Sequence, residues 1–483
     1  MVNFKIIFNT LGKLLLGLSL FLLLSLLISL FYDESDKTAF LNSFAITAIT
    51  GFFTILLTRK ANQKKLAKRE GYIIVSSVWV VFSIFGSLPY IFSGAIPSFA
   101  NAFFETISGF TTTGSSILNN IEELPHGILF WRSLTQWLGG MGIIVMFLAI
   151  LPLLGIGGRE LFVAEVPGPV PDKLHPRIKN TARKLWGLYL MFTLAETILL
   201  SIGGMSIFDS ICHSFTTMAT GGYSTKQASI GHYDSAYIHY IIILFMFIAG
   251  TNFTLSYAMI SKKFSKVYKD EEFKFYGILT LAISIIIAIG LIISNYGSVE
   301  QSFRDSLFQV VSIITTTGYA TSDYLLWPPI LGLLIYMMMF IGGSAGSTGG
   351  GVKIVRVVIF LKNSFLEFKR LIHPNAIVPV RYNNNVVDPK IIANILAFIG
   401  VYVIIFLFSI TIMSIWIPDF ETCFSSVATT LGNIGPGFGK VGPMENFSSL
   451  ADGAKYFLSF LMLVGRLELF TVLILFTPTF WKH

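Results

Sequence analysis

Ten stretches of this chain are long enough and apolar enough to cross a lipid bilayer as helices. The hydrocarbon core of a bilayer is about 30 Å thick, and a helix needs about 20 apolar residues to span it. Over the whole chain, 54% of the residues are hydrophobic and 12% are charged, whereas soluble domains carry about 25% charged residues. The sequence therefore predicts an all-α membrane protein with spans centred on residues 14–32, 39–58, 71–92, 133–154, 185–205, 237–261, 275–294, 325–341, 391–417 and 456–476.

The positive charges are divided unequally between the two sides of the predicted membrane. With the N-terminus placed inside, 27 of the 34 Lys and Arg residues fall on that side. This asymmetry follows the positive-inside rule and predicts that both termini are cytoplasmic. The formal charge of +8 then reflects topology and does not indicate nucleic acid as a partner. Two cysteines, Cys212 and Cys423, are too few for a disulfide framework or a cysteine metal site.

One short segment recurs four times and aligns without gaps on its last glycine. The copies read ETISGFTTTG, HSFTTMATGG, QVVSIITTTG and SVATTLGNIG, and they end at Gly114, Gly222, Gly318 and Gly435. One predicted span precedes each copy and one follows it, so all four units have the same orientation. Parallel units of this kind pack around an axis along the membrane normal. The expected fold is two N-terminal transmembrane helices plus four pseudo-fourfold helix, pore-loop, helix repeats around a central ion pore.

Each repeat should contain a short helix that leads up to its aligned glycine. About a dozen residues lead up to each glycine, which as a helix would be roughly 18 Å long and reach about halfway across the bilayer. Residues typical of helix starts occur at Pro97-Ser98, Ser206, Ser302 and Pro418-Asp419. We therefore divide the chain into an N-terminal two-helix hairpin, 1–69, and four pore repeats, 70–158, 159–270, 271–385 and 386–483.

The residues just ahead of the four glycines are uncharged, so they cannot hold an ion by ionised side chains but can offer it backbone carbonyl oxygens. Irregular backbone at membrane depth is tolerated where it lines a water-filled path, and glycine supplies the positive φ that turns successive carbonyls inward, as in potassium filters. A single TTTG is most often an ordinary turn, but four aligned copies between spans favour a cation filter. The expected potassium-binding residues, and the only metal site expected, are Thr112, Thr113, Gly114, Thr220, Gly221, Gly222, Thr316, Thr317, Gly318, Asn433, Ile434 and Gly435.

The third repeat carries IGGSAGSTGGG at 341–351, where its second span should continue. Each glycine costs about 1 kcal/mol relative to alanine in a helix, so the span should break there. A flexible loop under a filter is suited to gating, whereas a nucleotide-binding glycine loop would need a preceding strand. The candidate gate residues are Gly342, Gly343, Ser344, Ala345, Gly346, Ser347, Thr348, Gly349, Gly350, Gly351 and Lys353. Lys353 and Arg356 are expected to tether the loop at the cytoplasmic surface.

Arg466 is a second gate candidate. The spans that follow the four filters align as QWLGG, MFIAG, MFIGG and MLVGR, so Arg466 stands where the other copies have glycine. A charge at that depth is costly unless it faces water or a partner. Glu468 lies on a different helix face and should not be its close partner. We expect Arg466 to point into the ion path below the filter and to repel cations; the alternative is a structural salt bridge to another span.

Five further polar residues are expected to have structural roles. Glu105, His213, Gln309 and Ser426 occupy equivalent positions in the four short helices, where their polarity suggests contacts that brace the filter. Glu196 lies within a span and should face protein, because an exposed carboxylate is expensive in lipid.

These motifs resemble those of the Trk/Ktr/HKT superfamily of potassium transporters, and most closely its TrkH type. The resemblance covers the whole chain and rests on the four glycines and on FWRSLTQWLGGMG, EVPGPVPDKLHPRIKNTARKLW, GGSAGSTGGGVK and GRLELFT. It implies a pore-forming subunit in the bacterial inner membrane. Sodium-selective relatives tend to have serine at the first filter position, so Gly114 implies potassium.

The resemblance also implies two kinds of protein partner. One is a second copy of the chain, which would form a homodimer of pores. The other is a cytoplasmic ring of TrkA-type regulatory subunits, which would carry the nucleotide that this chain has no domain to bind. The basic segments 159–184 and 353–390 are the expected docking sites.

Two transport functions fit the sequence. The first is potassium uptake through a gated, carbonyl-lined filter. The second is a potassium/proton or potassium/sodium coupled symporter, which would need a titratable group at the site, and none of the filter residues titrates. An intramembrane hydrolase is excluded, because no nucleophile, histidine and carboxylate set lies at one depth.

Overall fold

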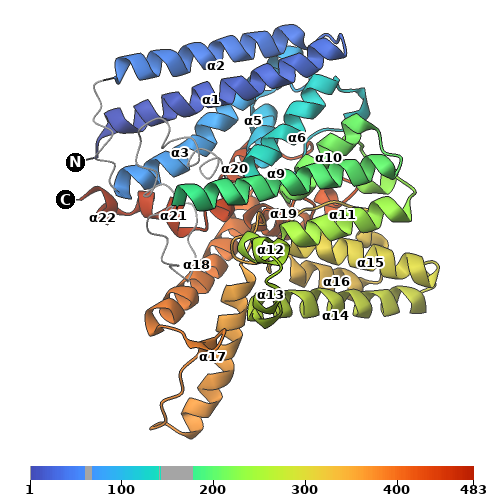
Figure 1. Ribbon diagram of the computed structural model, residues 1–483, viewed down its shortest axis with the longest axis vertical. Helices are drawn as coiled ribbons and strands as arrows, with labels where there is room; N and C mark the ends of the chain where they lie inside the picture. The colour runs from blue at the N-terminus through green and yellow to red at the C-terminus, as the bar shows by residue number, and fades with distance from the viewer. Residues whose placement is uncertain (1, 60–67, 141, 143–177, 483) are drawn as a thin grey trace.

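The computed structural model describes residues 2–59, 68–140, 142 and 178–482, and within them the chain is mostly helical (Figure 1). The N-terminal hairpin consists of α1 (Phe4–Phe31) and α2 (Lys37–Leu57), which pack along one flank of the molecule. The predicted all-α membrane architecture is confirmed. The first helices of the four repeats are α3 (Lys68–Gly86) continued by α4 (Leu88–Ser93), α9 (Ile178–Ile202), α14 (Glu271–Ile293) and α18 (Pro389–Met413).

Each repeat then has the short helix that the sequence predicts. Three of the four start where expected, with Ser98, Ser206 and Asp419 as N-cap residues. The third start was wrong: its N-cap is Ser298, whose hydroxyl accepts the Gln301 amide at 3.1 Å. Ser-x-x-Gln is a capping-box pattern, and it begins the helix four residues earlier. The four helices are α5 (Phe99–Phe110), α10 (Ile207–Met218), α15 (Val299–Ile314) and α19 (Phe420–Gly432).

Within the described residues, the helices that return after the filters are 10–15 residues long, each shorter than a full span. They are α6 (His126–Gly140), α11 (Ala236–Ala249), α16 (Pro329–Met338) and α20 (Asp452–Arg466). Beyond the break, α11 bends by 110° into α12 (Phe253–Ile260), and α20 bends by 111° into α21 (Phe470–Leu473) and η7 (Ile474–Phe476). The described residues therefore hold six span-length apolar helices, or eight if each bent pair is one span. Of the other two predicted spans, 325–341 contains the shorter apolar helix α16, and 133–154 extends beyond the described residues.

The breaks fall at the aligned glycine positions, so the interruption is not peculiar to the third repeat. A Cβ at Gly139 would collide with the carbonyl of Phe110, and one at Gly465 would collide with that of Leu431. In the first and fourth repeats the returning helix thus passes directly against the C-terminal end of its own short helix, where a side chain larger than that of glycine would not fit. In the first repeat α6 ends at Gly140, and the continuation predicted up to residue 154 lies outside the described residues.

The remaining elements are short. The segments after the filters contain η2 (Ile121–Glu123), η4 (Ser229–His232), η5 (Tyr324–Leu326) and η6 (Gly439–Val441). The other short elements are α13 (Phe264–Lys269), the antiparallel hairpin of β1 (Arg381–Tyr382) and β2 (Asn385–Val386), and the terminal α22 (Pro478–Trp481). The longer helix α17 (Ile354–Ile372) projects from the body in Figure 1. Of the repeat boundaries that we assigned, 270/271 coincides with the N-cap of α14, 69/70 lies within α3, 385/386 lies within β2, and 158/159 lies outside the described residues.

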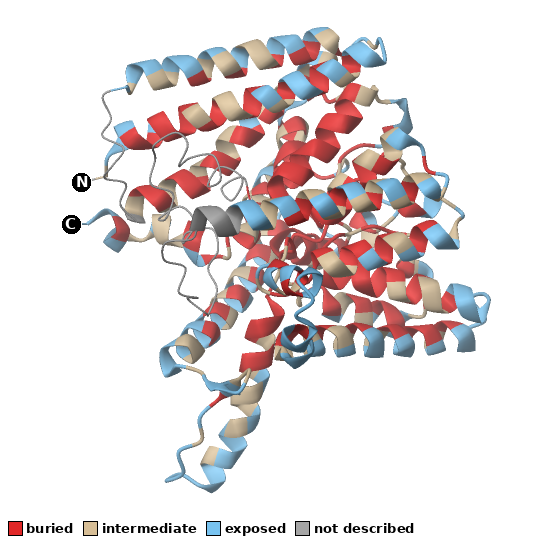
Figure 2. Ribbon diagram, viewed as in Figure 1, coloured by how far each residue is buried: buried red, intermediate tan, exposed pale blue. Residues whose placement is uncertain are grey.

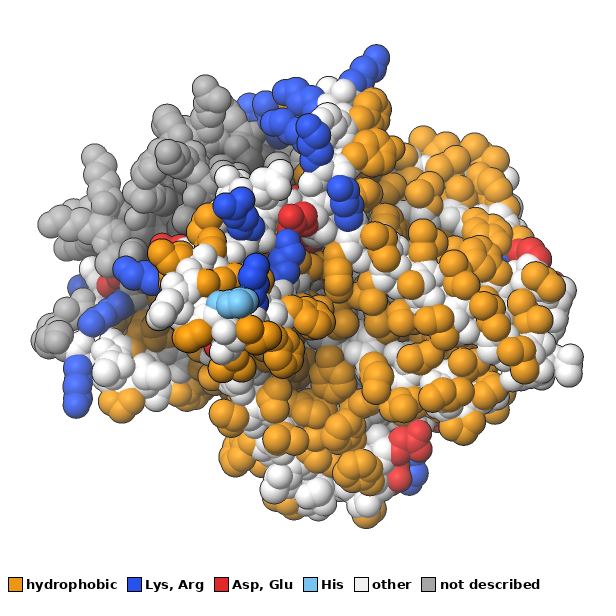
Figure 3. All heavy atoms as spheres, turned by 90° about the horizontal axis from the view of Figure 1, so that it is seen from below, with side chains coloured by type: hydrophobic (Ala, Val, Ile, Leu, Met, Phe, Trp, Pro, Cys, Tyr) orange, Lys and Arg blue, Asp and Glu red, His pale blue; other side chains and the backbone are white. Residues whose placement is uncertain are grey.

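Burial is concentrated where the short helices converge. Figure 2 shows buried residues around the central segments and exposed ones along the outer helices. Figure 3 shows one face, on which apolar side chains cover a broad area and Lys and Arg side chains gather on one part. A soluble protein rarely exposes so large an apolar patch, and a bilayer explains it.

Candidate ion filter and gate

The four filter segments, residues 112–114, 220–222, 316–318 and 433–435, share an unusual backbone. The last glycine of each has positive φ, between 75° and 103°, and so does the residue two positions earlier, between 53° and 60°. Positive φ at alternate residues turns successive carbonyls toward the same side. For the β-branched threonines this conformation is a genuine outlier that costs of order 1–3 kcal/mol. The surrounding structure must therefore stabilise it. The residues two before the glycines are Thr112, Thr220, Thr316 and Asn433.

The four glycines form a closed ring. A Cβ at Gly114 would collide with the carbonyl oxygen of Gly221, the residue before the second glycine. A Cβ at Gly222 would likewise collide with Thr317, and one at Gly318 with Ile434. A Cβ at Gly435 would lie 2.8 Å from the carbonyl oxygen of Thr113, which returns to the first repeat. Each segment therefore contacts the next around a single axis, as pseudo-fourfold packing requires.

Polar side chains of the short helices contact the irregular segments that follow the filter residues. The Glu105 carboxylate accepts the Ile117 amide at 2.9 Å, and Nε2 of His213 lies 2.9 Å from the Ser224 hydroxyl. Gln309 Nε2 donates to the Ser322 carbonyl at 3.2 Å. The fourth copy is different: the Ser426 hydroxyl bonds within its own helix, and the neighbouring Ser425 donates to the Phe438 carbonyl at 2.9 Å.

Gln136 on α6 contacts the filter in a way that the sequence did not predict. Its Nε2 donates to the Gly221 carbonyl at 2.7 Å, and its Oε1 accepts the Tyr223 amide at 3.0 Å. One of the carbonyls assigned to the filter thus has a protein donor, and Gly221 is also the only glycine at its position in the four copies.

The glycine loop, residues 341–351, lies at the C-terminal ends of the short helices. Its Gly350 amide donates to the Thr316 hydroxyl at 2.7 Å, and its Thr348 hydroxyl donates to the Met218 carbonyl at 3.0 Å. The Thr220 hydroxyl lies 3.3 Å from that of Thr348. The loop closes on itself through the Gly342 amide and the Val352 carbonyl, 2.9 Å apart. Its tip therefore contacts the filter threonines that have positive φ.

Arg466 ends α20 at the same place. Its Nη1 donates to the Thr112 hydroxyl at 2.9 Å and to the Thr348 carbonyl at 2.7 Å, and its Nη2 donates to the Gly139 carbonyl at 2.6 Å. One guanidinium thus joins the first filter segment, the glycine loop and the end of α6. As expected from its helix face, Glu468 has a different partner, Arg356.

The expectation that Lys353 and Arg356 sit at the cytoplasmic surface was wrong. Each is only 7% exposed. The Lys353 amine donates to the Gly349 carbonyl, while the Arg356 guanidinium pairs with Glu468 and lies 4.0 Å over the Phe398 ring. Both cations are held by protein groups within the gate region because the chain folds back over them.

Comparison with known proteins agrees with this architecture. The TrkH family, described as cation transport protein, matches residues 36–483. The chain belongs to the TrkH family. It is therefore a multi-pass membrane transport protein and not an enzyme. It is 41% identical over the full length of both chains to the Trk system potassium uptake protein TrkH of Escherichia coli strain K12, and 39% identical, again over both full lengths, to that of Halomonas elongata.

A solved structure shows the same fold. The crystal structure of the potassium transporter TrkH from Vibrio parahaemolyticus superposes with a TM-score of 0.89 at 36% identity and covers both chains completely. The fold predicted from the four repeats is thus the fold of the TrkH family.

A buried ion pair supports the first filter segment of this TrkH-family chain. Arg132 Nε donates to Glu105 at 2.7 Å, with both side chains at most 3% exposed, and its Nη1 donates to the Ser224 carbonyl at 2.7 Å. The guanidinium carbon also lies 3.6 Å from the centre of the Tyr223 ring. Arg132 therefore links the short helix of the first repeat to Ser224, two residues beyond Gly222 in the second.

We expect Arg132→Met to destabilise the protein by about 3–5 kcal/mol, because it leaves the Glu105 carboxylate buried without its charged partner. The measurement is the thermal midpoint of the purified protein in detergent. The double variant Glu105→Gln/Arg132→Met removes both charges and should recover most of the loss. A double variant as unstable as Arg132→Met would contradict the charge argument.

Glu196, on α9, is fully buried, so it faces protein as expected. Neither of its carboxylate oxygens has a hydrogen-bond partner among the described residues. In the part of the chain that the structure describes, no group of three His, Cys, Asp or Glu side chains is arranged to hold a metal.

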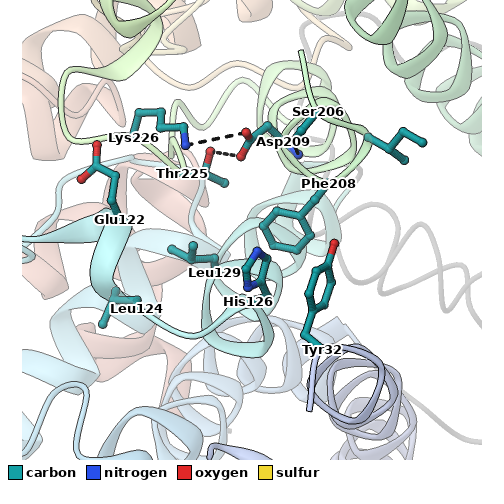
Figure 4. Close-up of a pocket in the computed structure, with 11 residues that line it drawn as sticks. Tyr32, Glu122, Leu124, His126, Leu129, Ser206, Phe208, Asp209, Thr225 and Lys226 are labelled. Carbon is teal, nitrogen blue, oxygen red and sulfur yellow. Dashed lines mark hydrogen bonds and ion pairs between the residues drawn. The ribbon is translucent and has the colours of Figure 1, made fainter. Parts of the chain in front are cut away.

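A surface cavity of about 350 Å³ lies beside the start of α10 (Figure 4). Asp209 in it accepts the Thr225 hydroxyl at 2.6 Å and pairs with Lys226 at 3.7 Å. His126 stacks on Tyr32 with ring centres 4.0 Å apart. The cavity contains none of the predicted filter or gate residues, and we assign it no part in transport.

Proposed function

We propose that this chain is the pore-forming subunit of a potassium uptake system, and that potassium crosses the membrane through the ring of filter carbonyls. The observation that carries the proposal is the closed contact of each filter glycine with the carbonyl of the next repeat. Rings of carbonyls replace the hydration shell of potassium. The names of the relatives, Trk system potassium uptake proteins, support the choice of ion.

The cation preference comes from the backbone. The twelve filter residues carry no ionisable side chain, so carbonyl oxygens and the C-terminal ends of four short helices supply the negative potential. The bracing contacts of Glu105, His213 and Gln309 keep the ring from collapsing or widening.

The gate in this proposal is the glycine loop together with Arg466. Both contact the inner end of the filter, through Thr316 and Thr112 respectively. The guanidinium adds a positive charge where a potassium ion would leave. Opening then requires the loop to give up its bonds to the filter threonines, and glycine makes this backbone change inexpensive.

The proposed assembly is a homodimer in the bacterial inner membrane with both termini cytoplasmic. A cytoplasmic TrkA-type ring would bind the regulating nucleotide and dock on the basic segments 159–184 and 353–390, of which 159–177 lie outside the described residues. The projecting α17 belongs to the second segment and supports this placement. Charge reversal at Lys362 and Lys369 that leaves co-purification with such a ring intact would contradict the docking site.

A proton-coupled symporter is the second candidate, because Glu196 places a carboxyl group inside the membrane part of the protein. It is the weaker candidate, since Glu196 contributes nothing to the filter ring. Coupling requires the proton site to sense the transported ion.

The deciding experiment is cation flux into proteoliposomes that contain the purified full chain. We expect potassium flux well above sodium flux, and the same potassium flux with or without a pH gradient at constant membrane potential. Potassium accumulation that follows the pH gradient would support symport. Equal potassium and sodium fluxes would contradict the filter.

A further inference from the structure

Glu272 is a buried carboxylate that contacts the glycine loop and the helix behind it. It lies in the first turn of α14 and is 4% exposed. Its Oε1 accepts the Ala345 amide at 2.7 Å and the Val355 amide at 3.0 Å. Ala345 belongs to the loop, and Val355 lies just beyond its end. A single oxygen from the first helix of the same repeat therefore joins the loop to the segment just beyond it.

The chemistry of this position calls for an acceptor. The first amides of a helix have no partner within it, and the N-cap residue of α17 is Lys353, which makes no side-chain cap bond. Glu272 supplies the missing acceptor to Val355, and its negative charge is favourable at a helix N-terminus. Hydrogen bonds to a charged acceptor are roughly twice as strong as those between neutral groups.

We propose that Glu272 is a positioning residue that fixes the glycine loop against the filter. The proposal rests on the function of the loop as a gate. Ala345 is three residues before Thr348 and five before Gly350, the two loop residues that reach the filter threonines. The same oxygen of Glu272 holds the Ala345 amide and the Val355 amide in the first turn of α17. Movement of this part of the loop away from the filter therefore requires the Ala345 amide to leave Glu272. The carboxylate thus sets how easily the loop moves.

The chain offers a matched control in the neighbouring residue. Glu271 carries the same charge at the same end of α14, but its carboxylate pairs with Lys362, eight residues into α17. Glu271→Gln therefore removes an equal charge without touching the bonds to the loop.

The test reports loop movement directly. Ser347→Cys places a thiol in the loop of the full chain, whose own cysteines, Cys212 and Cys423, are buried. In proteoliposomes, we expect Glu272→Ala to speed its modification by a small charged thiol reagent about tenfold, as the loss of hydrogen bonds to a charged group predicts. Glu272→Gln keeps an acceptor and should give a smaller increase. With Glu271→Gln, the thiol should be modified at the same rate as in the Ser347→Cys chain alone.

Two controls measure folding and potassium flux separately from loop movement. Glu272→Gln is isosteric, and its elution volume and thermal midpoint show that the chain is folded. If the thiol is modified in both Glu272 variants at the rate found for Ser347→Cys alone, Glu272 does not hold the loop, even where potassium flux is selective. If the unsubstituted chain carries no selective potassium flux, the proposed function fails, while the modification rates still decide whether Glu272 holds the loop.

Discussion

Gly318→Ala should abolish selective potassium flux. Gly318 has φ of +82°, and an added Cβ would collide with the Ile434 carbonyl and lie 2.8 Å from Pro436. The alanine can be accommodated only if that carbonyl moves out of the ring. Since each 1.4 kcal/mol in a barrier is a factor of ten in rate, a displaced carbonyl should lower potassium flux by at least roughly tenfold. The measurement is potassium and sodium uptake into proteoliposomes.

The matched control is Gly94→Ala. Gly94 has nearly the same conformation, φ of +75°, but nothing lies within 4 Å of the position of an added Cβ. The Gly94→Ala variant is therefore destabilised by about 1–2 kcal/mol, the cost of alanine at positive φ, but its new methyl group does not collide with a carbonyl. We expect this variant to be somewhat less stable and to transport normally. Equal loss of flux in both variants would mean that general destabilisation, and not the filter ring, explains the result.

Arg466→Ala should raise potassium flux through the chain on its own. The variant removes a positive charge from the inner end of the filter and breaks the bonds that join Thr112, Thr348 and Gly139. Two unit charges a few ångströms apart in a protein interact by several kcal/mol, so an increase of about tenfold or more is expected. Selectivity for potassium over sodium should persist, because the carbonyl ring is unchanged.

Arg466→Lys separates charge from geometry. Lysine keeps the positive charge but cannot reproduce the planar fork that reaches three segments at once. If electrostatic repulsion dominates, Arg466→Lys remains as closed as the parent; if the hydrogen bonds dominate, it leaks like Arg466→Ala. A fall in flux in both variants would show that Arg466 supports the filter and does not limit passage.

Local sequence features predicted the repeating parts of this protein. The four glycines, the starts of three short helices and the non-helical stretch at 342–351 are set by residue preferences within a few positions. The bracing roles of Glu105, His213 and Gln309 followed from their equivalent places in the repeats. The N-cap at Ser298 was also encoded locally, in a capping pattern with Gln301 that we overlooked.

Other features depend on contacts between residues far apart in the chain. Arg466 meets Thr112 across 354 positions, and Glu272 meets Val355 across 83. Burial of Lys353 follows from segments that fold over it, which no local pattern records. The bends after α11 and α20 occur because the returning helices pass close to the ends of the short helices.

The sequence by itself determined that four equivalent segments would meet at membrane depth, because spacing and apolar length are properties of the chain alone. Only the tertiary structure decided how they meet. Positive φ at Thr112, Thr220, Thr316 and Asn433 is unfavourable for these residues in isolation. It is stable here because closure of the ring places each carbonyl against the next glycine, and the loop and Arg466 then hold three of those four side chains from below.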